Sequence, residues 1–146
     1  MASFEIYTSV TYIGRQYMAR AAVADVKFDV ANYGIGTAGS DASGNPLPPD
    51  LSLTVIPDSS IMAATSTFAS RAYSSAYCLE FGINLPLGTG VLSGIGTSSN
   101  LGLIGTVLES SNPAEVGQQF LFALGNYGDK TKTATDVWDI TAIVNF

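Results

Sequence analysis

The strongest constraint on the fold is the alternation of apolar and polar residues at the C-terminal end of the chain. In DVWDITAIVNF, residues 136–146, every second position from Trp138 to Phe146 is apolar. Successive side chains of a β-strand point to opposite faces, so this pattern predicts a strand with Trp138, Ile140 and Val144 in the core. Because the alternation continues to the last residue, we expect Phe146 to lie in the core or in a contact with another subunit.

Other segments of the chain also have the apolar runs or the alternation of strands. They are VKFDVANYGIG (26–36), LSLTVIP (51–57), YCLEFGINL (77–85), LGLIGTVLES (101–110) and QFLFALGNY (119–127). The polar connection at 128–136 predicts that the last two strands form an antiparallel hairpin. Residues 59–75 fit either a weak helix or an irregular connection, because they are rich in Ser and Thr.

One helix is expected near the N-terminus. TYIGRQYMARAAV, residues 11–23, begins with a threonine suited to an N-cap and repeats apolar residues every four positions, at Ile13, Tyr17 and Ala21. The Gly-, Ser- and Pro-rich segments 37–50 and 86–100 predict exposed loops. At 146 residues the chain fits one domain, residues 1–146. We therefore expect a mainly β, antiparallel β-sandwich-like domain with one short N-terminal α-helix.

Charge and composition bear on the partners of the chain. Only 12% of residues are charged and the net charge is −6, so the clustered Lys and Arg residues that bind nucleic acid are absent. No segment reaches the roughly 18 apolar residues that span a membrane. The N-terminus MASFEIYTSV lacks the features of a signal peptide, which predicts folding in the cytosol. We expect neither nucleic acid nor a membrane as partner.

The side chains needed for catalysis are sparse in this sequence. There is no histidine, which excludes a Ser-His-Asp triad, and the single Cys78 lies in a strand pattern. Asp41 lacks the further ligands of a calcium loop, and GTGVLSGIG (88–96) lacks the spacing and the lysine of phosphate-binding loops. We expect no enzyme, no cofactor and no metal; carboxylates such as Glu80 and Asp139 could still converge in space and would then reopen an enzyme hypothesis.

The order of several short motifs resembles that of a known family. These motifs are the helix start with Thr11 and Gly14, the segment NYGIGTAGSDASGNPLPP (32–49), LGLIGTVLES (101–110) and the closing stretch 120–146. In this order they resemble the N-terminal domain of tailed-phage tail-collar fibre proteins and related neck and baseplate proteins. Two departures are the lack of the family's Gly-Asp-Gly at residues 34–39 and the lack of a fibre shaft after Phe146. The resemblance thus implies an anchor or adaptor rather than a whole receptor-binding fibre.

The resemblance also implies a function. The chain would be a structural component of a tailed-phage virion, made in the host cytoplasm and acting in the collar, tail or baseplate. Its partners would be other virion proteins and copies of itself, in a trimer or a higher ring. The expected contact residues are Arg15, Arg20, Tyr33, Leu87, Val91, Lys130, Lys132 and Phe146. Two alternatives are a capsid decoration (cement) protein and a carbohydrate-binding β-sandwich module.

Overall fold

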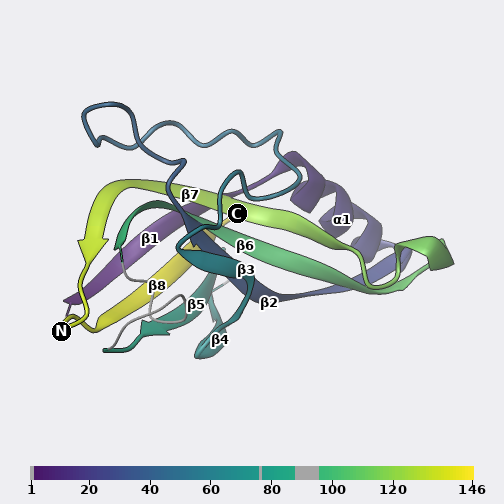
Figure 1. The fold of residues 1–146 in the computed structure, drawn as a ribbon. Helices are drawn as coiled ribbons and strands as arrows, with labels where there is room; N and C mark the ends of the chain where they lie inside the picture. Colours follow the sequence, from purple (N-terminus) through teal and green to yellow (C-terminus); the bar gives the residue numbers. More distant parts are fainter. Residues whose placement is uncertain (1, 76, 88–95) are drawn as a thin grey trace.

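A single curled sheet forms most of the molecule (Figure 1). The computed structural model describes residues 2–75, 77–87 and 96–146. These residues form eight strands in the order β3-β2-β6-β7-β1-β8-β5-β4. The elements are β1 (Ala2–Val10), α1 (Tyr12–Ala22), β2 (Val26–Gly36), β3 (Met62–Thr67), β4 (Ser70–Ser75), β5 (Cys78–Leu85), β6 (Gly96–Ser110), the 3-10 helix η2 (Pro113–Glu115), β7 (Gln119–Lys132) and β8 (Trp138–Asn145).

The sheet curls until its two halves face each other across the core. One half consists of β3, β2, β6 and β7, the other of β8, β5 and β4, and β1 joins them. Phe68 lies in the corner between β3 and β4, with its ring 5.2 Å from Tyr33 of β2 and 4.8 Å from Phe81 of β5. Aromatic packing therefore links the two halves. The prediction of a mainly β, sandwich-like fold with one helix is confirmed.

The predicted C-terminal hairpin is wrong, because β1 lies between β7 and β8. β1 pairs with β8 in parallel, from Ala2 opposite Trp138 to Thr8 opposite Val144, and pairs antiparallel with β7 at Ser9 and Val10. The sheet is therefore mixed, although its other pairings are antiparallel. The N-terminal strand β1 occupies the place beside β7 that sequence analysis gave to the closing strand.

The core positions of the closing strand are confirmed, but its last residue is not one of them. Trp138, Ile140 and Val144 are buried, and Trp138 packs edge-on against Phe4, with 5.1 Å between the ring centres. β8 ends at Asn145, and Phe146 is 53% exposed. The backbone N–H of Phe146 still donates to the carbonyl of Tyr77, so the chain end is tied to the sheet while its ring is not part of the core.

The predicted helix is present, with the predicted cap. The Thr11 hydroxyl accepts a hydrogen bond from the N–H of Gly14 (2.9 Å) and donates to the carbonyl of Leu121 (2.5 Å). Tyr17 stacks on Phe120, with ring centres 4.2 Å apart. A Cβ at Gly14 would collide with the carbonyl oxygen of Phe122, so the glycine lets the helix backbone approach β7 closely. The helix thereby covers the core face of the half formed by β3, β2, β6 and β7. We call this half, which contains the longest strands, the long half.

Two secondary-structure predictions in the middle of the chain need correction. Residues 51–57 form no strand; they cross the outer face of the long half, where Leu53 and Ile56 pack against a cluster of Ile104, Leu121 and Leu124. The packing does not follow the alternation of the sequence, because Leu53 and Ile56 are three residues apart and Val55 between them is exposed. Residues 59–75 are neither helix nor irregular connection, because they contain β3 and β4.

Of the two segments predicted as exposed loops, 37–50 contains no strand, whereas the last residues of 86–100 belong to β6. Residues 37–50 carry no strand and are mostly exposed, as Figure 1 shows for the long excursion that follows β2. In 86–100, Pro86 and Leu87 are exposed and residues 88–95 lie outside the described residues. Residues 96–100 belong to β6, and Ser98, Ser99 and Asn100 are buried, so a loop at this end of the segment is wrong. These small polar residues gave no apolar pattern from which a buried strand could be predicted.

Candidate functional site

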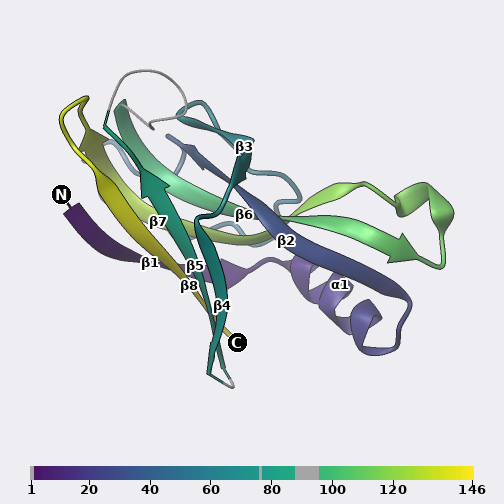
Figure 2. The same ribbon diagram turned by 90° about the horizontal axis from the view of Figure 1, so that it is seen from below.

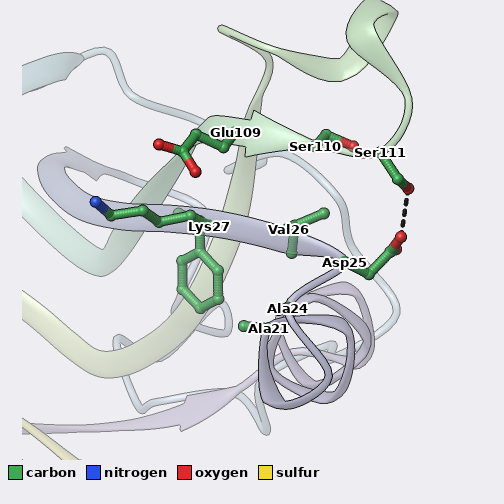
Figure 3. A pocket seen from close by; sticks show the side chains of 9 residues that line it. Ala21, Ala24, Asp25, Val26, Lys27, Glu109, Ser110 and Ser111 are labelled. Carbon is green, nitrogen blue, oxygen red and sulfur yellow. Dashed lines mark hydrogen bonds between the residues drawn. The ribbon is translucent and has the colours of Figure 1, made fainter.

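A hollow of about 600 Å³ lies where the end of α1, the start of β2 and the end of β6 meet (Figure 3). Lys27 and Glu109 occupy paired positions on β2 and β6 above the hollow. The Ser111 hydroxyl donates a hydrogen bond to Asp25, and together with Arg20 it lowers the pKa of that carboxyl. A carboxylate with a lowered pKa is a weak base. The arrangement offers polar contacts to a surface ligand, and Asp25 is poorly suited to removing a proton at neutral pH.

Arg20 forms an ion-pair network beside this hollow. Its Nε lies 2.5 Å from Asp25 Oδ2, and its Nη1 and Nη2 donate to Glu115 at 2.6 and 3.0 Å. Tyr17 also donates to Glu115, at 3.1 Å. The network joins the end of α1 to η2. Sequence analysis placed Arg20 on a contact surface, whereas the structure uses its guanidinium for bonds within the chain.

We expect this network to make stability depend on pH in the acid range. The pKa of Glu115 is lowered from its usual 4.5, mainly by hydrogen bonds from Arg20, and that of Asp25 is lowered from 3.8, mainly by Ser111 and then Arg20. A lowered folded-state pKa contributes stability that is present above the usual values and is lost as the pH falls through the folded-state pKa. Arg20→Met should therefore lower the urea midpoint at pH 7 and lower it much less near pH 2.

The control is Arg15→Met, which removes the same charge from an exposed position of the same helix. Its urea midpoint should stay close to that of the unmodified protein at both pH values. A loss of stability in Arg20→Met that is equal at pH 7 and pH 2 would contradict the role of the carboxylates. Such a result would assign the effect to lost packing of the arginine stem instead.

A second feature is the gap between two unpaired strand edges, which we call the β2–β4 opening. β4 pairs only with β5, and all six of its residues are exposed. β2 pairs with β3 only from Asn32 to Ile35, so residues 26–31 have no strand partner on that side among the described residues. Figure 2 shows β2 and β4 diverging below β3. The described sheet thus remains open here.

One side chain bridges the β2–β4 opening. The guanidinium of Arg71, on β4, lies 2.5 Å from Asp29 and donates to the carbonyl of Val30 at 3.0 Å, both on β2. Both charged side chains are partly exposed, at 47% and 41%, so the pair is screened by water. It neutralises the charge of Arg71 without closing the sheet.

The β2–β4 opening leads into an apolar pocket of about 280 Å³. Phe28 and Val30 line it from β2, and Leu79 and Phe81 line it from β5. Tyr73 lies at its margin and is 72% exposed. Free backbone edges beside an apolar pocket are suited to an added extended strand, because main-chain hydrogen bonds give affinity and pockets receive alternate side chains.

The predicted contact residues lie in several places. Arg15 and Phe146 border one hollow of about 370 Å³, together with Met18. Leu87 is exposed, and the ammonium of Lys130 lies 5.0 Å from the centre of the Phe4 ring. The structure therefore does not gather these residues into one surface.

Two of the predicted contact residues are corrected, and one falls outside the described part. Tyr33 is 3% exposed and packs in the core, and Lys132 is 1% exposed, with its ammonium donating to the carbonyl of Pro86 at 2.8 Å. Neither side chain is available to a neighbour. Val91 lies outside the described residues.

Sequence analysis missed the β2–β4 opening. A signal was present, since Arg71 is the only charged residue between Asp58 and Glu80. Natural proteins usually place charged residues on strand edges that must not pair. A long segment with a single charge is therefore typical of an edge that is open to pairing. Sequence analysis instead interpreted this nearly uncharged stretch as a weak helix or an irregular connection.

Comparison with known proteins adds no relative: no protein-family model, no curated protein and no solved structure matches this chain. Within the described part of the chain, no three Cys, Asp or Glu side chains lie close enough together to hold a metal ion. In that same part, no helix has the length and apolar character needed to cross a membrane.

Proposed function

We propose that this chain is a non-catalytic assembly domain that binds copies of itself and neighbouring proteins in a tailed-phage particle, at the collar, tail or baseplate. The observation that carries the proposal is the β2–β4 opening, where the fully exposed strand β4 borders an apolar pocket. An uncovered edge of this kind is a template for pairing with another chain. The resemblance of the sequence motifs to tail-collar proteins supports the particle context.

Low surface charge also supports the proposal. Only 12% of the residues are charged, and exposed Ser, Thr and Tyr residues form much of the exterior in place of solvating charges. Such surfaces are suited to burial against neighbours in a repeated assembly. The domain would be made in the host cytoplasm, would reside in the virion and would act as a homo-oligomer. A capsid decoration protein would use the same assembly chemistry and would differ in its place on the particle.

Light scattering of the purified chain across a hundredfold range of concentrations tests the proposal. We expect a discrete oligomer to form as the concentration rises, because the contact depends on mass action between copies. A chain that stays monomeric throughout would contradict self-assembly. Detection of the chain at a fixed copy number in purified phage particles would test the particle context separately.

A carbohydrate-binding module is the second candidate, because four tyrosines are highly exposed. Tyr7, Tyr12, Tyr73 and Tyr77 are 63%, 62%, 72% and 72% exposed, and exposed aromatic rings can stack on sugars. In that case a glycan should raise the thermal midpoint of a monomer, and Tyr73→Ala should abolish the increase. No glycan-dependent shift is expected from an assembly domain.

A further inference from the structure

We infer that the partner at the β2–β4 opening is a second copy of this chain, which adds its own β4 to the edge of β4 in antiparallel orientation. This inference rests on the proposed assembly function and names the contact. β4 has β5 on one side only, and its six residues, SRAYSS, include no proline. Backbone N–H and C=O groups along its other side are therefore free to bond to an extended chain.

The opposite edge of the sheet is less suited to this contact. The carbonyl of Thr65 in β3 already accepts a hydrogen bond from the side chain of Asn32, at 3.0 Å. The carbonyl of Ala63 accepts one from the Ser66 hydroxyl, at 2.8 Å. Side chains thus occupy two backbone acceptors of β3, whereas no side chain of the described residues bonds to a backbone group of residues 70–74 in β4.

Charge favours a second copy at this edge. The chain carries a net charge of −6, so two copies repel each other over most of their surfaces. The segment 59–79 contains no carboxylate, and its one charged residue, Arg71, is paired with Asp29 of its own chain. The strand β4 therefore brings no carboxylate of its own to the contact, and the two acidic groups nearest to it, Asp29 and Glu80, bond to Arg71 and to Ser74 of the same chain.

Two-fold symmetry also keeps the arginines apart. In an antiparallel pair of β4 strands centred on Ala72, on Tyr73 or between them, Arg71 faces Tyr73, Ser74 or Ser75 of the other copy and never Arg71 itself. Tyr73 lies on the same side of the strand as Arg71 and the apolar pocket. The contact would thus cover the exposed Tyr73 rings as it extends the sheet from one copy to the next.

Sedimentation velocity of Ala72→Lys tests the inference. Ala72 is exposed and pairs with Glu80 of β5, so a lysine there has an acidic neighbour and is compatible with the folded monomer. In the paired state two lysines would meet near the symmetry axis, and we expect at least a tenfold weaker association. The matched control is Thr141→Lys on β8, which adds the same charge on the same face of a strand flanked by β1 and β5. It should associate as the unmodified protein does.

The outcomes separate the contact from the function. If both lysine variants associate as the unmodified chain does, or if the oligomer contains an odd number of copies, the inferred contact is overturned while assembly itself stands. An equal loss in both variants overturns it as well, because the effect would then come from charge alone. A strictly monomeric unmodified chain overturns both the contact and the proposed function. Circular dichroism checks folding, and Tyr73→Ser replaces Ala72→Lys if the latter unfolds.

Discussion

Trp138→Ala is expected to lower the free energy of unfolding by about 3 to 5 kcal/mol, the usual cost of truncating a large buried aromatic residue. Trp138 is 5% exposed, packs edge-on against Phe4 and begins the strand that joins β1 to β5. The substitution would leave a cavity where the beginnings of β1 and β8 lie side by side in parallel. Urea denaturation followed by circular dichroism measures the loss.

Phe146→Ala is the matched control for Trp138→Ala. The alternation of the sequence places both residues on one face of the closing strand, yet Phe146 is 53% exposed. Removal of this ring should change the free energy of unfolding by no more than about 0.5 kcal/mol, as for most surface positions. Equal losses for the two variants would contradict the structure of the C-terminal end.

Gly36→Ala is expected to cost about 3 kcal/mol, at the upper end of the range for overpacking. A Cβ at Gly36 would collide with the carbonyl group of Asp58, and backbone atoms cannot rotate away as a side chain can. The carboxylate of Asp58 also accepts hydrogen bonds from the N–H (3.0 Å) and the hydroxyl of Thr37. The added methyl group would therefore separate two segments that bond to each other. Urea denaturation again provides the measurement.

Ala38→Val controls for the addition of carbon atoms to the same region. Ala38 is exposed two residues further along the chain, so its larger side chain meets solvent. Its free energy of unfolding should stay within about 0.5 kcal/mol of the unmodified protein. If Gly36→Ala were as stable as Ala38→Val, the close contact between Gly36 and Asp58 would be contradicted.

The sequence predicted the elements with strong periodicity. The helix and its Thr11 cap follow from local capping chemistry, and the strand at 78–85 follows from period-two alternation. Alternation identifies which residues share a face but not which strands pair. This is why the expected hairpin of β7 and β8 was wrong: the intervening strand comes from the N-terminus, more than 100 residues away along the chain.

The same period-two alternation would also have predicted the strand β1. Phe4, Ile6, Thr8 and Val10 alternate with Ser3, Glu5, Tyr7 and Ser9. Sequence analysis compared this segment only with the features of a signal peptide, which it lacks. β3 and β4 were harder to predict, because both are short and rich in small polar residues, and β4 has no buried residue to produce a pattern.

The candidate site depends on tertiary structure and could not be read from local patterns. Tyr33 and Lys132 were expected at contacts, but whether an aromatic or a lysine side chain is buried depends on what the rest of the chain places over it. The β2–β4 opening exists because β3 pairs with one half of β2 and the chain then continues into β4 beside β5. Such a gap appears only once the sheet is assembled.

Amide hydrogen exchange of residues 70–75, at low and high protein concentration, tests the assembly account most directly. In the dilute monomer, β4 should exchange much faster than residues 139–145 of β8, which has strand neighbours on both sides. At high concentration, exchange in β4 should slow markedly while that in β8 stays the same, because a second chain would then bond to the free edge. Exchange in β4 that does not depend on concentration while oligomers form would contradict the role of this edge.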